Sequence, residues 1–365
     1  MNIEKKVAFV GPMPPPLGGV AIMNRAFQEL VNDTYDIFCF NTSRGNERED
    51  LYNTNKIKNI LPQIIKMKAF VAFAKNDSYN IANLFVTTGF GFIREAFFIF
   101  VLKLFNKRII VHLHSKKHGE YFLSKSRIRI LAYFLNKTDK IIVLSDDHYK
   151  YFSQYFDKEK MTVIENFVDY EKYSCSMDDK YKEFLYVGRL SEKKGFFDLL
   201  DSIEILKNKG LMLKIHILGA PENDYVEQEI DRKISEKGIT KYLEFHGLKY
   251  GKEKYELFKK CTYFVFPSHF ENSPVVLKEA IASKMAIITS DLDANQNVLK
   301  VLDDFCLFRT GDANDLAKTI MSIVNNEKRT HLLMEKASKT TLYDKSIAKT
   351  KLMALINDLR EKGSL

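Results

Sequence analysis

Glu271 and Glu279 stand eight residues apart, and together they could hold two parts of one extended ligand. The apolar residues 263–267 predict a buried strand before them, and residues 275–282 predict a helix after a short polar turn. The amide groups that open a helix favour an anion, above all a phosphate. Because Glu279 would lie about two turns into the helix, the two carboxylates are too far apart to form a close acid pair. The residues expected to present the helix start are Asn272, Ser273, Pro274 and Val275, with Pro274 at about the first helical position.

A second strand–turn–helix stretch carries two cations. Residues 183–187 predict a strand, and a helix is expected from about Phe196. Gly188 permits a tight turn between them, and Arg189 and Lys194 place positive charge where a diphosphate would need it. A basic turn alone is usually solvated surface, but two such motifs in one α/β region favour a phosphate site.

Both stretches resemble the signature segments of the retaining family 4 glycosyltransferases, which have the GT-B fold. Residues 187–195, VGRLSEKKG, look like the first segment, and residues 270–280, FENSPVVLKEA, look like the E-x7-E motif. Residues 7–12 and 16–20 are similar to the first strand and glycine-rich loop of that family. Residues 163–169 resemble its segment at the domain junction.

This resemblance implies an enzyme that moves a hexose-type sugar from a UDP- or GDP-linked donor with retention of configuration. Arg189 and Lys194 would then neutralise the departing diphosphate, Glu271 would contact the transferred sugar, and Glu279 would bind the ribose. A surface turn and ordinary helix carboxylates are the structural alternatives for these four residues.

Gly18 and Gly19 precede a predicted helix and could bring backbone amides close to a phosphate or to the acceptor. Gly219 and Gly247 each follow a predicted strand and could admit the base, although ordinary loop glycines explain them as well. His114 resembles the active-site histidine of the family. No metal and no other cofactor is expected, because the family does not generally need one.

Two further motifs could have a functional role, and each has an alternative explanation. His112 and His114 end a predicted strand, and alternation puts both on one face, with His114 nearer the carboxyl end and therefore favoured for the site. Both histidines could instead be structural. Asp291-Leu292-Asp293 has the form of a metal motif from another glycosyltransferase fold, but its setting resembles GT-B and it is set aside. Glycines and a glutamate are commoner at residues 291–297 in the family, which leaves donor recognition there open.

Alternating strand and helix patterns predict parallel sheets in two doubly wound, Rossmann-like domains that face each other across a cleft. An acceptor-binding domain is expected over residues 1–170 and a nucleotide-sugar-binding domain over 171–343, joined by a polar linker at 170–182. Residues 344–365 would form a helix that returns to the first domain. Strands are expected at residues 6–10, 35–40, 81–86, 108–112, 140–144, 162–164, 183–187, 214–218, 243–245, 263–266, 286–289 and 306–308. Helices are expected at residues 19–31, 92–105, 125–136, 195–207, 225–237, 252–259, 275–282 and 313–325.

Composition sets wider limits. The length of 365 residues suits two domains. The formal net charge is +9. The four cysteines are scattered without metal-ligand or redox spacing, and the three in strand-like surroundings are expected to be buried thiols in a reducing cytoplasm. The cysteines are Cys39, Cys175, Cys261 and Cys306. Neither a signal peptide nor a membrane-spanning helix is expected from the sequence.

Residues 51–150 hold 17 Lys and Arg against 6 Asp and Glu, interleaved with apolar runs. Amphipathic helices with solvated lysines explain this, and so does attachment to an anionic membrane, where each basic group adds about 1 kcal/mol. No nucleic-acid-binding motif accompanies the charge, so nucleic acid is not an expected partner.

The resemblance favours a cytoplasmic enzyme, peripheral on the inner face of the cytoplasmic membrane. It would extend a lipid-linked glycan for a bacterial surface polysaccharide such as O-antigen, capsule or exopolysaccharide. Three alternatives stay open: a nucleotide-sugar 2-epimerase, a transferase to a soluble acceptor, and a non-catalytic sugar-nucleotide-binding subunit of a synthesis complex.

Overall fold

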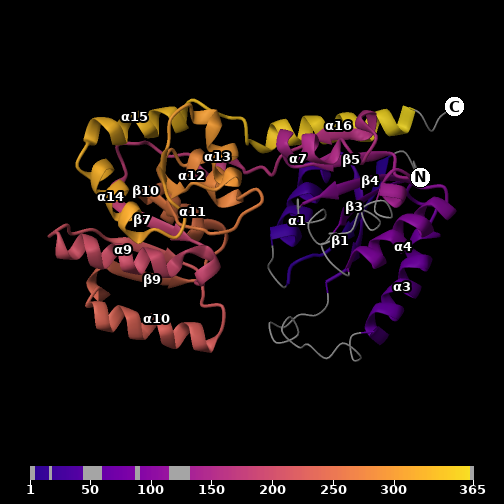
Figure 1. Ribbon diagram of the computed structural model, residues 1–365. Coiled ribbons are helices and arrows are strands. Elements are labelled where there is room, and N and C mark those ends of the chain that lie inside the picture. The colour runs from indigo at the N-terminus through magenta and orange to yellow at the C-terminus, as the bar shows by residue number, and fades with distance from the viewer. Residues whose placement is uncertain (1–4, 16–18, 44–59, 87–90, 115–131, 362–365) are drawn as a thin grey trace. The chain divides into compact units, whose positions relative to one another are not determined.

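A computed structural model describes residues 5–15, 19–43, 60–86, 91–114 and 132–361 of the chain (Figure 1). The chain divides into two compact units. The first comprises Met1–Asn166 with Ser346–Leu365, and the second comprises Phe167–Lys345. Each unit is built on its own six-stranded parallel sheet.

The first sheet has the strand order β2-β1-β3-β4-β5-β6. Its strands are β1 (Lys6–Gly11), β2 (Asp36–Asn41), β3 (Ile81–Val86), β4 (Arg108–Leu113), β5 (Lys140–Val143) and β6 (Met161–Val163). Every residue of β1 and β3 is buried, as expected for parallel strands covered on both faces. The helices of this unit are α1 (Gly19–Val31), α3 (Ile60–Ala74), α4 (Gly91–Leu104), α7 (Asp146–Phe152) and α16 (Lys345–Glu361).

The last helix, α16, packs on the first unit. The Tyr35 hydroxyl donates to Asn357 Oδ1 at 3.0 Å, and Lys140 Nζ lies 2.9 Å from a carboxylate oxygen of Asp358. Within the second unit, Lys345 at the start of α16 pairs with Asp169 at 2.9 Å. The chain therefore leaves the first unit near residue 166 and re-enters it near residue 346.

The second sheet has the strand order β12-β11-β10-β7-β8-β9. Its strands are β7 (Tyr181–Val187), β8 (Ile215–Leu218), β9 (Leu243–Gly247), β10 (Cys261–Phe266), β11 (Ala286–Ser290) and β12 (Cys306–Phe308). The order reverses between β7 and β10, and ligands of doubly wound folds bind beyond the carboxyl ends of strands at such a point. The helices are α8 (Tyr170–Tyr173), α9 (Phe196–Asn208), α10 (Asp224–Lys237), α11 (Gly251–Lys260), α12 (Val275–Ala282), α13 (Asp293–Leu299), α14 (Ala313–Val324) and α15 (Glu327–Ser338).

Apolar layers on both faces hold the second sheet between its helices. On one face, side chains of α9 and α14 pack against strand residues such as Phe184 and Ile217. On the other, α11 and α12 pack against Leu185 and Phe264. Packing of these two layers holds the sheet rigidly between its helices, and this positions the loops that follow the strands at the switch point.

The structure confirms the expected α/β fold class with parallel sheets, and it places each expected strand within about two residues of its predicted bounds. The linker prediction for residues 170–182 is wrong at both ends, because α8 and the first residues of β7 belong to the second unit. Cys39 is exposed rather than buried, since its strand β2 lies at the sheet edge. The helix predicted at 125–136 falls largely outside the described residues. None of the described helices is both long and apolar enough to cross a membrane.

Candidate active site

The loops that follow β7 and β10 meet at the switch point of the second sheet. The β7 loop contains a short 3-10 turn, Glu192–Lys194, and then Gly195 with a φ of 63°. A Cβ atom built on Gly195 would lie 1.8 Å from the carbonyl oxygen of Pro267, in the β10 loop. Only glycine allows this backbone conformation and this approach together, so the loops after β7 and β10 are in direct contact.

Lys194 and Glu271 form an ion pair across these loops. Lys194 Nζ lies 2.5 Å from Glu271 Oε1, and the side chains keep 32% and 12% of their surface exposed. Beneath them, the fully buried Tyr186 donates its hydroxyl to the Arg189 carbonyl at 2.9 Å. Burial, with the Glu271 charge adding to it, raises the pKa of Tyr186 well above its ordinary value, so this phenol stays a neutral donor.

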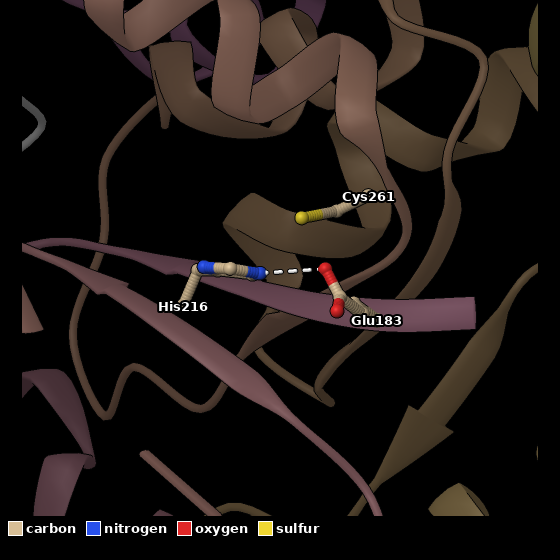
Figure 2. A group of neighbouring side chains, drawn as sticks. All are labelled: Glu183, His216 and Cys261. Atoms are coloured by element: carbon tan, nitrogen blue, oxygen red, sulfur yellow. Dashed lines mark hydrogen bonds and ion pairs between the residues drawn. The ribbon is translucent and has the colours of Figure 1, made fainter. Parts of the chain in front are cut away.

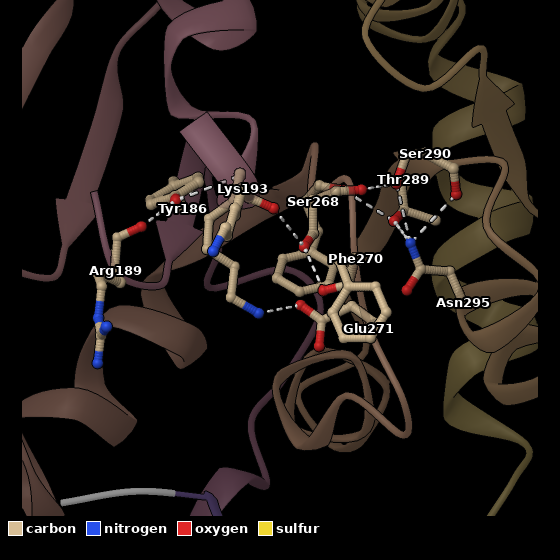
Figure 3. A network of polar contacts seen from close by, with 11 residues as sticks. Tyr186, Arg189, Lys193, Ser268, Phe270, Glu271, Thr289, Ser290 and Asn295 are labelled. Carbon is tan, nitrogen blue, oxygen red and sulfur yellow. Dashed lines mark hydrogen bonds and ion pairs between the residues drawn. The ribbon is translucent and has the colours of Figure 1, made fainter. Parts of the chain in front are cut away.

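Further hydrogen bonds fix the backbone around this pair (Figure 3). The His269 amide donates to the Lys193 carbonyl at 3.0 Å, and the Ser268 hydroxyl donates to the Phe270 carbonyl at 3.2 Å. The His269 ring contacts the Asp198 carboxylate on α9. The β10 loop is therefore anchored both by the 3-10 turn at residues 192–194 and by the first turn of α9.

A buried polar cluster supports the same loop from the β11 side. Asn295, fully buried in α13, donates to Thr289 Oγ1 at 2.9 Å and to Ser290 Oγ at 3.0 Å. Ser290 in turn donates to the Ser268 carbonyl at 2.5 Å (Figure 3). These contacts restrict where the residues before Glu271 can lie.

Three glycines lie side by side at the carboxyl ends of β7, β8 and β9. The Gly188 amide donates to the Leu218 carbonyl at 3.1 Å, and the Gly219 amide donates to the Gly247 carbonyl at 2.9 Å. A Cβ atom on Gly219 would lie 1.9 Å from the Gly188 carbonyl oxygen, so a side chain there is excluded. Arg189 follows Gly188 directly in the chain. Its guanidinium lies 3.3 Å from the Glu222 carboxylate, and about half of the Arg189 side chain is exposed.

Helix α12 begins at Val275, as predicted, directly after the loop that carries Asn272 and Ser273. Pro274 is the residue before the helix, with φ −69° and ψ 112°, rather than the first helical residue. Pro274 provides no side-chain cap for this helix start, and the first turn of α12 holds no acidic residue. The terminus thus keeps the positive end of the helix dipole available to an anion.

Glu279 belongs to a separate network, about one turn into α12 rather than the two turns expected. The Tyr173 hydroxyl donates to Glu279 Oε1 at 2.5 Å, and Lys254 Nζ lies 2.6 Å from the same oxygen. Burial raises the pKa of Tyr173 well above its ordinary value, and the Glu279 charge adds to this. The other oxygen, Oε2, is buried and accepts no hydrogen bond from the residues that the structure describes.

In the first unit, His114 follows β4 and is 8% exposed. Its ring lies nearly parallel to that of His112, with centroids 6.1 Å apart, which confirms that both lie on one face. His112 is fully buried, and burial lowers its pKa well below the ordinary value. Gly19 is the first residue of α1, where a Cβ atom would meet no atom within 4 Å. Gly18 lies outside the described residues.

Asp291 and Asp293 have different structural partners. Asp291 Oδ1 accepts hydrogen bonds from the Thr310 amide at 2.9 Å and hydroxyl at 2.6 Å, and these lower its pKa. Asp293 is the first residue of α13, where a negative charge suits the helix dipole.

Sequence patterns missed several side chains that shape the site. Asp198 and Tyr186 lie beside the first motif, but nothing in their spacing indicated contact with His269 or Arg189. Tyr173 and Lys254 come from segments predicted as a linker and a helix. Their contacts depend on how distant elements pack, and no local pattern encodes that.

Comparison with known proteins covers both halves of the chain. Residues 172–340 match the family model described as glycosyl transferases group 1, and residues 28–172 match the one described as glycosyltransferase family 4. The capsular polysaccharide biosynthesis glycosyltransferase CapM of Staphylococcus aureus is 24% identical over 60% of this chain and 60% of its own length. The first curated relatives are matched over only 46–60% of their length.

A second relative and a solved structure extend this comparison. The N,N'-diacetylbacillosaminyl-diphospho-undecaprenol alpha-1,3-N-acetylgalactosaminyltransferase of Campylobacter jejuni is 25% identical over 65% of this chain and 60% of its own length. The crystal structure of Anabaena Alr3699/HepE with UDP superposes with a TM-score of 0.76 and 17% identity, covering 97% of this chain and 100% of HepE. This likeness confirms the GT-B fold.

Proposed function

The chain belongs to the glycosyltransferases that join a family 4 domain to a group 1 domain, and we propose that it is a retaining enzyme acting in bacterial surface-polysaccharide biosynthesis. It transfers a hexose-type sugar from a UDP- or GDP-sugar to a lipid-linked glycan. The observation that carries this proposal is the Lys194–Glu271 pair at the switch point of the second sheet, beside the start of α12.

The relatives support the donor and acceptor classes. The Campylobacter protein is named for an undecaprenol-linked substrate, and HepE was crystallised with UDP and with UDP-glucose. A relative from Xanthomonas oryzae, 25% identical over 47% of this chain, is named as a GDP-mannose:cellobiosyl-diphosphopolyprenol mannosyltransferase. UDP and GDP are therefore the two nucleotides to test first.

The chemistry follows from charge. As the sugar leaves, negative charge builds on the diphosphate, and preorganised donors that meet this charge supply the largest catalytic effect. Arg189, Lys194 and the first amides of α12 are such donors. Lys194 must then share its ammonium between Glu271 and the phosphate, which ties the position of Glu271 to donor binding.

Glu271 and His114 are the proposed catalytic side chains that contact the transferred sugar. The acceptor attacks from the same face that the diphosphate leaves, and the departing phosphate oxygen takes the acceptor proton. This assignment leaves Glu271 as a positioning carboxylate rather than a nucleophile. Isolation of a covalent sugar ester on Glu271 during turnover would contradict it.

A nucleotide titration tests the proposed function. UDP, GDP, ADP, CMP and their sugars are added to the purified protein, and its thermal unfolding is followed. One diphosphate nucleotide is expected to raise Tm, and Arg189→Ala is expected to reduce that shift. No shift with any nucleotide would contradict the donor site.

Glu279 is proposed to accept a hydrogen bond from a ribose hydroxyl through Oε2. Because this atom is buried, the ribose must displace protein atoms that now cover it. Analogues lacking the 2′ or 3′ hydroxyl are expected to bind about tenfold more weakly than the full nucleotide. In Glu279→Gln this difference should shrink, as measured by calorimetry. An unchanged difference would assign Glu279 to packing alone.

Membrane attachment through the first unit is the proposed localisation. Helices α3 and α4 pack together through Phe70 and Phe98, whose ring centroids lie 3.8 Å apart. Their outer surfaces expose Ile65, Phe100 and Leu104 by 59%, 59% and 64%. Apolar side chains among lysines fit the interface of an anionic membrane.

Vesicle sedimentation tests this surface. The protein is expected to bind vesicles that contain phosphatidylglycerol, less so at high salt, and Phe100→Ser with Leu104→Ser should weaken binding at least about tenfold. Met212→Ser is the control, since Met212 is 61% exposed in the second unit. Equal loss in both variants, or no vesicle binding at all, would contradict the proposal.

A further inference from the structure

A second group of reactive side chains lies on the same sheet near the amino ends of its strands (Figure 2). Glu183 is the third residue of β7, His216 the second of β8, and Cys261 the first of β10. One ligand atom from each lies within 4.8 Å of the other two. His216 and Cys261 are buried, while Glu183 keeps 22% of its side chain exposed.

Strand register explains this convergence. Leu185 of β7 pairs with His216 of β8, so Glu183, two residues earlier, points to the same face of the sheet as His216. Cys261 packs in the apolar layer of that face, with Leu185 and Phe264. Figure 2 shows the sulfur turned toward the gap between the imidazole and the carboxylate. Since the three residues come from different strands, their spacing in the sequence does not indicate a ligand set.

We propose that this cluster binds one Zn²⁺ ion through a Glu183 oxygen, His216 Nε2 and Cys261 Sγ, with water completing a tetrahedron. One carboxylate, one imidazole and one thiolate make a borderline-soft donor set, which suits zinc better than magnesium or calcium. Around a zinc ion, such ligand atoms stand about 3.3 Å apart. The Glu183–His216 contact of 2.7 Å therefore has to open by only about 0.6 Å.

A second layer already orients the imidazole. His216 Nδ1 lies 2.8 Å from His246 Nε2, so a metal on Nε2 leaves the Nδ1 proton to be donated to His246. Glu244 lies 3.7 Å from His216 and 3.5 Å from His246. A histidine held through its other nitrogen is the usual arrangement at zinc sites.

Two lysines compete for the carboxylates. Lys260 Nζ lies 3.6 Å from Glu183 Oε2, and Lys214 Nζ lies 3.9 Å from Glu183 Oε1 and 2.5 Å from Glu244. Both side chains are about 40% exposed and can turn into water when an ion enters. Burial, with the Glu183 charge adding to it, raises the pKa of Cys261 to about 12, so zinc must displace the thiol proton and binds more weakly as pH falls.

The ion would join β7, β8 and β10 at the edge opposite the glycine loops, so its role is structural and independent of the proposed transfer. Without an ion, the same groups form a hydrogen-bonded chain from His246 through His216 to Glu183. Metal titration separates these two states.

The test uses Co²⁺, which reports thiolate ligation by a charge-transfer absorption band, and Zn²⁺. After chelator treatment, the full chain is expected to bind one Co²⁺ with that band, and Zn²⁺ should displace it. Cys261→Ser is expected to lose the band, and Glu183→Gln to weaken binding at least about tenfold while keeping the fold. Cys306→Ser is the matched control, because Cys306 is also a buried thiol at the first residue of a strand.

Zn²⁺ should also raise the Tm of the wild type and of Cys306→Ser, and raise that of Glu183→Gln by less at the same Zn²⁺ concentration. The Tm shift caused by a nucleotide should be the same with and without zinc, which keeps this test separate from that of the donor site. Failure to retain one ion per chain would overturn the proposal. So would a Co²⁺ spectrum in Cys261→Ser equal to that of the wild type.

Discussion

Replacing Lys194 by alanine is expected to lower kcat/KM for the nucleotide sugar by about 10²–10³-fold, the usual loss when one donor to a developing oxyanion is removed. Two effects combine here. The diphosphate loses a cation, and Glu271, whose side chain is only 12% exposed, is left as an uncompensated carboxylate beside it. Steady-state kinetics and calorimetry with the free nucleotide measure the two effects.

The double variant Lys194→Ala with Glu271→Ala separates these effects. Removing the stranded carboxylate should restore part of the nucleotide affinity lost in Lys194→Ala, without restoring turnover. Lys193→Ala is the matched control: its side chain is exposed in the same turn, and its contacts to Ser268 and His269 are made by its backbone carbonyl. If Lys193→Ala lost as much activity as Lys194→Ala, the ion pair would not explain the effect.

The fold was predictable because its signals are local. Apolar runs of strand length closed by Gly188, Gly219 or Pro267 indicated parallel strands, and the bounds of α1 and α12 match those predicted. No bounds were predicted for helices α3, α7, α13 and α15. Residues 60–74 are apolar around much of the helix, and α7 has only seven residues, so neither shows a clear 3.6-residue period.

The candidate site was predictable only as two segments. Their residue types indicated a phosphate site, and the sheet order explains why the loops meet. What the sequence could not supply was the pairing of side chains: Lys194 with Glu271, Arg189 with Glu222, and Glu279 with Lys254. Such pairs depend on rotamers and on the packing of distant elements, which no spacing rule encodes.

The same limit applies more strongly to the cluster around His216. Judged by sequence spacing, Cys261 gave no indication of a ligand. Parallel register brings it beside residues that lie far away in the chain, and this contact is visible only once the strand order is known.

Gly195→Ala is expected to give the largest loss of stability, about 3 kcal/mol or more in denaturant unfolding. A left-handed conformation costs a residue with a side chain about 1–2 kcal/mol. The new Cβ atom would also lie 1.8 Å from the Pro267 carbonyl oxygen, so the loops after β7 and β10 must move apart. That movement displaces Lys194 from Glu271, and a shift of about 1 Å at a reacting group costs about 10²-fold in rate.

Gly210→Ala separates the backbone strain from the steric clash. Gly210 has a φ of 76°, but a Cβ atom there would meet no atom within 4 Å. Its loss of stability should therefore stay near 1 kcal/mol, with nucleotide binding unchanged. If both variants lost the same stability and both still bound nucleotide, the contact between the loops after β7 and β10 would not be what holds the donor site in place.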